Sequence, residues 1–196
     1  MVGLVSLVFL ALAMMINDPT LRPGDWNKPG ITLGPAASSA PAAVNAVQTL
    51  AQLPVRPRSW AQGFDRNNFN GYDFDHNGCE TKSDLLARDL SDERVRSDCS
   101  VTYGVLNDRY NGVSIELNRG RISVDHVVSL SDAWQKGGER WDQIKLQSFG
   151  NDPLNLIVTQ TPTNQDKGNL DASQWLPPDA SYRCGFVTSQ IAIKRQ

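Results

Sequence analysis

The stretch Gly120-Arg-Ile-Ser-Val-Asp-His-Val-Val-Ser-Leu-Ser-Asp-Ala-Trp134 sets an acidic residue and a histidine side by side within a run of β-branched residues. Residues 122–128 predict a β-strand because apolar, β-branched side chains dominate them. Successive side chains of a strand point to opposite faces, so either Asp125 or His126 must point inward unless the strand ends or bulges between them. Two interpretations stay open from this stretch alone. The histidine is held by a hydrogen bond near a strand end, or both polar side chains belong to a site.

The length and composition fit one domain with accessory segments. The chain has 196 residues, and its five Trp and six Phe are enough for an apolar core. The formal net charge is −2 and the pI is about 5.6. This charge balance argues against a protein that coats nucleic acid by charge alone.

The first 41 residues differ in composition from the rest. Residues 1–16 contain an uncharged apolar run that is too short for a typical membrane span and predicts a signal peptide or a short membrane anchor. Residues 17–41 are rich in Pro, Gly, Ala and Ser and predict a flexible linker. We therefore expect residues 42–196 to form the folded domain, secreted or anchored outside the cytoplasm.

The three cysteines are consistent with export. A disulfide between Cys79 and Cys99 would close a loop across a helix and stabilise the fold by about 3 kcal/mol on the loop-entropy argument. Cys184 is left over. The cysteine spacings match no zinc site, because the chain has no Cys-x-x-Cys pair and only two histidines.

The segment from 73 to 84 carries a second set of oxygen ligands. Asp73, Asp75, Asn77 and Asp84 stand at positions 1, 3, 5 and 12 of a calcium-loop pattern, with Gly78 at position 6. A structural Ca²⁺ site is one interpretation. The other is a turn in which these side chains cap their own backbone.

Hydrophobic periodicity predicts a mixed α+β domain. Apolar residues spaced by three or four predict helices, alternating ones predict strands, and Gly168 predicts the end of the helix before it. The expected helices are Ala42–Leu53, Ser83–Leu90, 131–146 with Trp134 and Trp141 in the core, 161–167 and Tyr182–Lys194; the expected strands are Val101–Val105 and Val113–Leu117 as a hairpin, 122–128 and Leu154–Val158.

Polar residues on these elements follow a recognisable order. Asp125 and His126 lie on one strand, Asn155 on the next, and Asn164 and Lys167 on the following helix. This order resembles the HNH nuclease motif, a β-hairpin and a helix around one divalent metal ion. Further stretches are similar to exported actinobacterial HNH-family proteins, which are related to the C-terminal domain of GmrSD-type restriction endonucleases: Gly78–Leu90, Asn151–Leu156 and Trp175–Pro178.

The resemblance implies a role for each of these residues. Asp125 and Asn164 would hold Mg²⁺ or Mn²⁺, for which carboxylate and amide oxygens are suitable ligands. His126 would be the general base, since its ordinary pKa suits proton transfer near neutral pH. Asn155 would tie the hairpin together and orient the histidine. Lys167, three residues after Asn164, would contact a phosphate or else lie in solvent.

Two more basic residues are candidates for phosphate contacts. Lys82 stands where proteins of the family that this chain resembles usually carry Arg. A lysine there would lack the bidentate geometry of a guanidinium group. Arg88 would lie at the rim of the site, or would form a solvated helix pair with Asp89.

We therefore expect an α+β domain with an embedded ββα-metal (HNH, His-Me finger) motif that hydrolyses phosphodiester bonds of DNA, with RNA as a second substrate. The sequence shows no recognition helix or zinc finger, so we expect it to cut without marked sequence preference. We also expect a monomer, and no protein partner is evident. One alternative is a calcium-stabilised extracellular binding domain without catalysis. Another is a nuclease-like domain that only binds DNA.

Overall fold

A computed structural model of the chain describes residues 46–57, 59–71, 73, 75–118 and 121–196. The predicted signal peptide or anchor at 1–16 and the predicted linker at 17–41 lie outside the described residues. No helix in the described part of the chain is long and apolar enough to cross a membrane.

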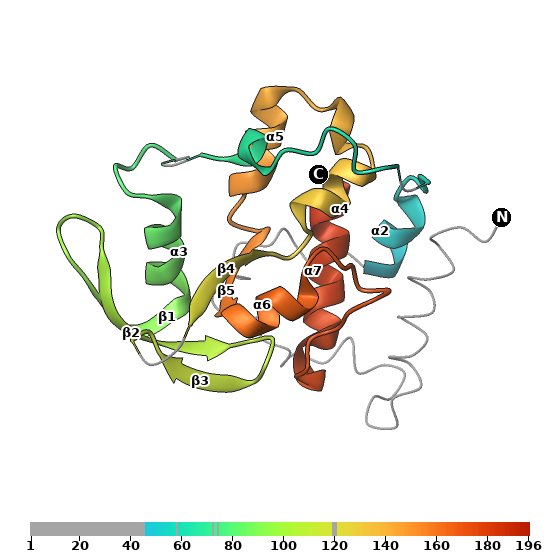
Figure 1. Cartoon of the computed structure of the whole chain (residues 1–196). Helices are drawn as coiled ribbons and strands as arrows, with labels where there is room; N and C mark the ends of the chain where they lie inside the picture. Colours follow the sequence, from blue (N-terminus) through green and yellow to red (C-terminus); the bar gives the residue numbers. More distant parts are fainter. Residues whose placement is uncertain (1–45, 58, 72, 74, 119–120) are drawn as a thin grey trace.

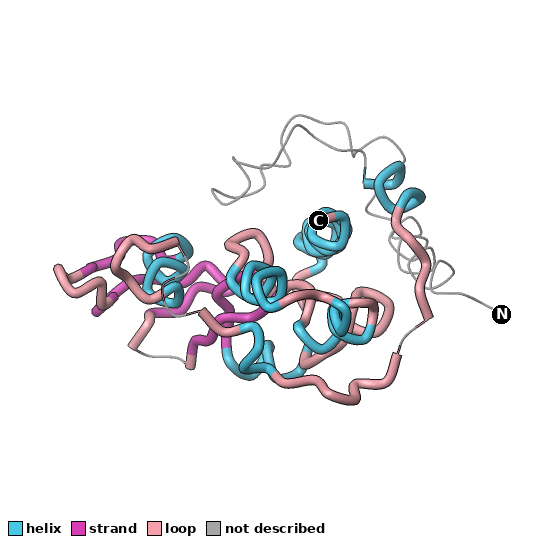
Figure 2. The backbone as a smooth tube through the Cα atoms, turned by 90° about the horizontal axis from the view of Figure 1, so that it is seen from above, coloured by secondary structure: helices cyan, strands magenta, loops and turns pink. Residues whose placement is uncertain are grey.

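The strands gather at one end of the molecule and most of the helices at the other (Figure 2). The chain therefore has the mixed α+β character that the periodicity predicts. In chain order the elements are α2 (Ala46–Gln52), η3 (Arg66–Phe69), α3 (Thr81–Asp89), β1 (Leu90–Val95), β2 (Val101–Asp108), β3 (Val113–Glu116), β4 (Ile122–His126), α4 (Leu130–Gln135), η4 (Gly138–Arg140), α5 (Gln143–Asn151), β5 (Leu156–Gln160), α6 (Thr161–Lys167), η5 (Ala180–Tyr182) and α7 (Arg183–Arg195).

Two antiparallel sheets carry the strands. The first has the order β1-β2-β3, and the second is the pair β4-β5. The predicted β2-β3 hairpin is confirmed, but β1 was not expected, because the helix was predicted to continue through Leu90. After Leu90, every residue of β1 is exposed, so this edge strand lacks the apolar alternation that identifies strands in a sequence.

The strand pair β4-β5 lies in the centre of the molecule, between the three-stranded sheet with α3 and the helices α6 and α7 (Figure 1). Five residue pairs fix its register, from Ile122 opposite Gln160 to His126 opposite Leu156. Helix α6 begins directly after β5, so β4, β5 and α6 form a ββα unit. Helices α4 and α5 lie in the connection between the two strands.

The connection between β4 and β5 contains two helices where the sequence predicts one. The predicted helix 131–146 is interrupted at Gly137, whose φ of 129° is strained for any residue with a side chain. Trp134 and Trp141, predicted as core anchors, are both partly buried against the main apolar core. The core positions are therefore as predicted, although the helix is broken between them.

Helix α2 keeps part of the face that its sequence predicts. A three-residue spacing of Val44, Val47, Leu50 and Leu53 predicts one apolar face, but Val47 is 53% exposed. Ala46, Leu50 and Leu53 pack against the main core instead, at the spacing of a helical stripe. The buried members of this core come largely from α4, α5, α7 and the β4-β5 hairpin.

Buried polar contacts join the two sheets. The Asp108 carboxylate, 1% exposed at the end of β2, accepts hydrogen bonds from the Thr159 hydroxyl and the Gln160 amide of β5, each at 3.0 Å. The Arg88 guanidinium of α3 donates to the carbonyls of Pro153 and Leu156, each at 2.7 Å. These contacts hold the hairpin against β2 and α3.

The predicted disulfide between Cys79 and Cys99 is present, with the two Cα atoms 5.6 Å apart. It links the segment before α3 to the turn between β1 and β2. Cys184 lies on α7 and is not part of a disulfide.

We predict that the double substitution Cys79→Ser/Cys99→Ser lowers the free energy of unfolding by about 3 kcal/mol, because the unfolded chain regains the entropy of the closed loop. Equilibrium unfolding in urea measures this change. Cys184→Ser keeps the disulfide and should unfold close to the wild type. A double variant as stable as the wild type would show that the bridge does not constrain the unfolded chain.

Candidate active site

A polar cavity of about 170 Å³ opens beside the β4-β5 hairpin and α6. It brings together Asp125, His126 and Asn164, three of the residues that the sequence predicts for the site. Its lining is Phe64, Arg66, Val124, Asp125, His126, Ser129, Leu130, Ser131, Asn164, Gly168 and Asn169.

Asp125 is buried and paired at the centre of the ββα unit. Its carboxylate contacts the Lys167 ammonium, at 3.0 Å through Oδ1 and 2.9 Å through Oδ2. The Tyr110 hydroxyl donates to Oδ2 at 2.9 Å. Burial raises the pKa of the Asp125 carboxyl, and Lys167 and Tyr110 act against that shift. Burial also raises the pKa of Tyr110 well above its usual value, so its hydroxyl keeps the proton that it donates.

Lys167 differs from both of its sequence-based interpretations, the phosphate contact and the solvated side chain. Its side chain has no exposed surface. Besides pairing with Asp125, its ammonium donates to the carbonyl oxygen of His126 at 2.8 Å. The lysine is therefore a buried counter-ion that joins α6 to β4. The spacing of residues within α6 does not predict this burial.

His126 is held in one tautomer by the backbone of α5. Its Nε2 lies 2.8 Å from the carbonyl oxygen of Gly150, and a carbonyl can only accept, so Nε2 carries the proton and Nδ1 the lone pair. Burial lowers the pKa of His126 to about 4, although the bond to Gly150 opposes this shift. The imidazole is therefore neutral at pH 7.

Gly150 can occupy its position only because glycine has no side chain. A Cβ atom there would lie 2.3 Å from the carbonyl oxygen of Phe69 in η3, far inside van der Waals contact. Only glycine lets α5 approach η3 this closely. The carbonyl that orients His126 is thus set by backbone packing.

Asn155 has the tying role that the resemblance implies. It is completely buried, its Oδ1 accepts from the Val128 amide at 2.8 Å, and its Nδ2 donates to the Val128 carbonyl at 3.2 Å. Its Nδ2 also lies 3.5 Å from the carbonyl oxygen of Phe149, next to Gly150. The amide therefore fixes both the chain after His126 and the end of α5 that holds the imidazole.

Asn164 presents an amide oxygen in the cavity wall. Its Nδ2 donates to the Ser123 hydroxyl at 3.0 Å and to the Val124 carbonyl at 3.1 Å. These two bonds fix the amide plane and identify which atom is nitrogen. Among the described residues, Oδ1 of Asn164 has no hydrogen-bond partner.

The donor set fits a hard divalent cation in its chemistry. Asp125 and Asn164 supply a carboxylate and an amide oxygen to one cavity, and a carboxylate has lone pairs beyond those used by Lys167 and Tyr110. No group of three His, Cys, Asp or Glu side chains suited to a metal occurs within the described ranges. A cation here would thus depend on the neutral amide and on water, which is usual for Mg²⁺.

The other predicted site residues lie outside the cavity. Arg88 is bonded to Asp89 as well as to the two carbonyls near β5, so its position is explained by the fold. Lys82 is exposed on the first turn of α3. No contact with a substrate tests either residue, and their phosphate contacts stay predictions.

The segment from 73 to 84 has the contacts of a self-capped turn. Asp73 accepts from the amides of Asn77 and Gly78 at 3.1 and 2.9 Å, and the Asn77 side chain accepts from the Cys79 amide at 2.7 Å. Asp75 bonds the Asn77 side chain, while Asp84 belongs to α3. Calcium binding here stays a prediction.

No sequence pattern identifies three further contributors to the site. Tyr110 lies in the turn between β2 and β3, where the sequence predicts only a turn, yet it is buried against Asp125. Gly150 acts through a carbonyl, which every residue has. Arg66 comes from η3 and adds a guanidinium group to the cavity wall. Each of these contacts joins residues far apart in the chain, so no local pattern predicts it.

Comparison with known proteins gives two matches. Residues 80–196 match the family described as GmrSD restriction endonucleases, C-terminal domain. An uncharacterized secreted protein of Arthroderma benhamiae is 33% identical over 162 residues, which cover 82% of this chain and 79% of that protein. No solved structure matches the chain. The secreted relative and the disulfide are consistent with an extracellular location.

We predict that Lys167→Met and Asp125→Asn each lower the free energy of unfolding, by about 3–5 kcal/mol where a buried charge is left unpaired. The double variant should lose less than the sum of the two losses, because it leaves no unpaired charge. Urea unfolding of the four proteins measures this cycle. Strictly additive losses would show that the two charges do not stabilise one another.

We also predict a pH dependence of stability that comes from His126. Its pKa is near 6.5 in the unfolded chain and about 4 in the fold, so only the unfolded chain takes up the proton between these values. The free energy of unfolding should fall as the pH falls through this window, by up to about 1.4 kcal/mol per pH unit, and level off below it.

The variant His126→Asn cannot titrate in this window and serves as the comparison. Urea unfolding of both proteins at pH 7, 6 and 5 should show the steeper decline in the wild type. Parallel declines would mean that the folded histidine keeps an ordinary pKa.

Proposed function

Because this chain belongs to the family of the GmrSD restriction endonuclease C-terminal domain, we propose that it is an endonuclease of the HNH type that hydrolyses phosphodiester bonds of DNA. The observation that carries the proposal is the convergence of Asp125, His126 and Asn164 on one polar cavity. Membership of the family supports a nuclease-related function. The side chains that line the cavity support an endonuclease of the HNH type.

His126 is proposed as the general base. It is neutral at pH 7, its Nε2–H is bound to the Gly150 carbonyl, and its Nδ1 lone pair has no partner among the described residues. A water molecule that donates to Nδ1 would lose its proton to the ring as its oxygen attacks phosphorus. The bond between phosphorus and the leaving oxygen then breaks, and the leaving oxygen takes up a proton. A positioned base of this kind accelerates a reaction about 10²–10⁴-fold.

Asp125 and Asn164 are proposed to hold a divalent cation, Mg²⁺ or Mn²⁺. Such an ion, when bound, stabilises the negative charge that develops on the phosphate and leaving oxygens. Lys167 supplies a fixed positive charge beside Asp125 and neutralises that carboxylate. We therefore expect weaker metal binding than at an unpaired buried carboxylate.

Arg66 is proposed to bind the scissile or a neighbouring phosphate. Its side chain lines the same cavity as His126, and a guanidinium group binds phosphate oxygens in a bidentate manner. Its positive charge also contributes to lowering the pKa of His126, which keeps the base free of a proton. The Arg66 guanidinium would then both bind the substrate phosphate and keep the pKa of His126 low.

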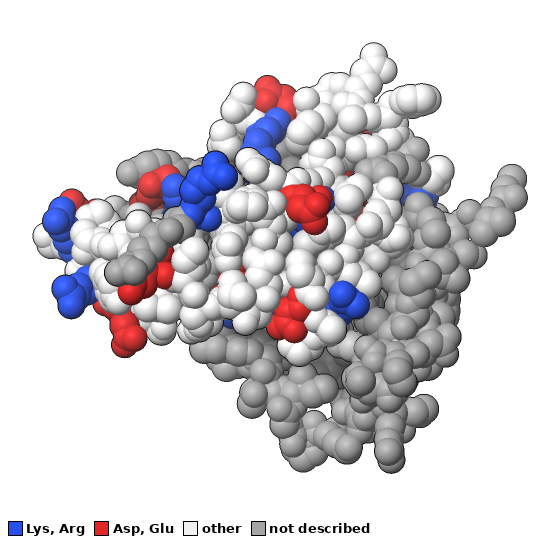
Figure 3. Space-filling model, turned by 60° about the horizontal axis from the view of Figure 1, so that its bottom comes forward, with Lys and Arg blue, Asp and Glu red and all other residues white. Residues whose placement is uncertain are grey.

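The substrate is proposed to be DNA bound without marked sequence preference by a secreted monomer. In the face seen in Figure 3, basic and acidic side chains are interspersed among uncharged ones, with no continuous basic surface. Together with the pI near 5.6, this favours a few local phosphate contacts over coating of the nucleic acid.

We predict that the purified domain nicks supercoiled plasmid in Mg²⁺ or Mn²⁺ and stops when EDTA is added. His126→Ala should lose at least about 10²-fold in rate, because the water loses its proton acceptor. Conversion of supercoiled to open-circular DNA on agarose gels measures the rate.

The chain contains a matched control in its second histidine. His76 is exposed in the segment from 73 to 84, so His76→Ala should cut like the wild type. Equal cutting by the two alanine variants would remove His126 as the base. A wild type that cuts neither DNA nor RNA in either metal would overturn the nuclease proposal.

A further inference from the structure

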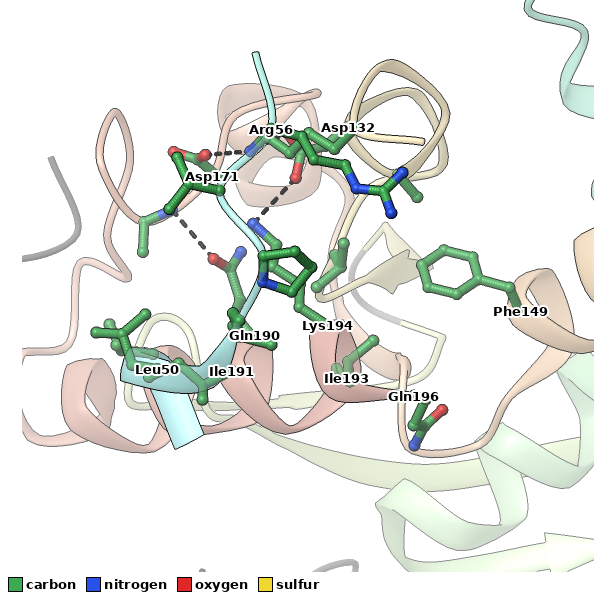
Figure 4. Close-up of a pocket in the computed structure, with 18 of the residues that line it drawn as sticks. Leu50, Arg56, Asp132, Phe149, Asp171, Gln190, Ile191, Ile193, Lys194 and Gln196 are labelled. Carbon is green, nitrogen blue, oxygen red and sulfur yellow. Dashed lines mark hydrogen bonds and ion pairs between the residues drawn. The ribbon is translucent and has the colours of Figure 1, made fainter. Parts of the chain in front are cut away.

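A second cavity, of about 200 Å³, lies between the segment after α2, α4 and α7. Most of its surface is apolar, supplied by residues such as Leu50, Val187 and Ile191. Figure 4 shows the segment that follows α2 passing over it, with α7 as its floor. An apolar cavity of about 150 Å³ is large enough for benzene, so this one can take a somewhat larger apolar body.

The acidic groups of this cavity are already paired. The Lys136 ammonium lies 2.6 Å from Asp132 Oδ1 and 2.6 Å from Asp171 Oδ2, and Lys194 lies 3.2 Å from Asp132 Oδ2. These contacts, drawn in part in Figure 4, form a closed network of two acids and two lysines. The network holds the pKa of Asp171 well below its usual value, despite burial. It therefore leaves no acidic side chain of the lining for a cationic ligand.

Among the basic groups at the mouth, Arg56 is not paired in this way. Arg56 has no hydrogen bond or ion pair with any described residue, and Figure 4 shows its guanidinium reaching across the cavity. A Cβ atom on Gly137 would lie 3.1 Å from Arg56 and 3.7 Å from Arg140, so two guanidinium groups stand close together. Arg140 pairs with Glu139 at 3.5 Å, which leaves Arg56 as the group without a counter-ion among the described residues. Lys145 also lines the cavity, with its ammonium 3.2 Å from the carbonyl oxygen of Gln196.

We propose that this cavity binds a small amphipathic anion, with an apolar body of roughly ten carbon atoms and one carboxylate or sulfonate group. The apolar body fills the space over α7, and the anionic group meets Arg56 at the mouth. A neutral apolar ligand would leave the Arg56 guanidinium without a counter-ion. A small inorganic anion would leave the apolar walls unfilled.

The proposed ligand site is separate from the candidate active site. Helix α4 lies between the two cavities: Leu130 and Ser131 line the polar one, and Asp132 and Ala133 line the apolar one. The proposal of a ligand site therefore does not depend on the nuclease proposal.

Decanoate tests the proposal, with decanol as the neutral ligand of equal chain length. Isothermal titration calorimetry on the full chain should show one decanoate per chain, bound at least tenfold more tightly than decanol. Arg56→Glu, at an exposed position, should weaken decanoate at least tenfold and leave decanol unchanged. Arg121→Glu, which removes an exposed arginine outside the lining, should change neither.

Three results would overturn the proposal. They are the absence of saturable decanoate binding, equal affinity for decanoate and decanol, and equal effects of the two arginine substitutions. Circular dichroism of Arg56→Glu distinguishes a lost contact from a lost fold. If that variant unfolds, Arg56→Gln replaces it, with the same tenfold loss expected for decanoate alone.

Discussion

The buried ion pair between Asp125 and Lys167 is the constraint on which the centre of the molecule depends. Burying a lone carboxylate costs several kcal/mol, so the chain must bring a partner to it. Lys167 comes from α6 and Tyr110 from the turn after β2, and both meet Asp125 on β4. Three elements are thereby fixed around one charge. Asn164 stands one helical turn before Lys167, so the ion pair also sets the position of that amide.

The adjacent residues Asp125 and His126 on β4 have opposite kinds of partner. Asp125 pairs with the Lys167 ammonium, whereas His126 bonds to a backbone carbonyl and to no carboxylate of the described residues. Burial then raises the pKa of the first and lowers the pKa of the second. The neutral form of the imidazole is favoured, and the proton on Nε2 is fixed by Gly150. The contacts of Gly150 with His126 and of Asn155 with Phe149 therefore set the orientation of the imidazole and the position of its proton.

The parts of the site that the sequence predicted are those with a local pattern. The strand with Asp125 and His126 and the helix with Asn164 follow from hydrophobic period and turn residues, and the resemblance supplied the tying role of Asn155. The charged edge strand β1 has no such pattern and was missed. The contact between Tyr110 and Asp125 spans 15 residues and depends on how the two sheets pack. The burial of Lys167 likewise depends on tertiary packing, which overrides the usual preference of lysine for solvent.

The register of the β4-β5 hairpin limits how the site can change. Asp125 stands opposite Ile157 and His126 opposite Leu156. Because side chains alternate along a strand, a slip of one residue would exchange the faces of the carboxylate and the imidazole. There is no intermediate register that would weaken the site gradually. A residue inserted into or deleted from either strand would therefore disturb the site unless a β-bulge absorbed the change, whereas a change of length in the connections would keep the register.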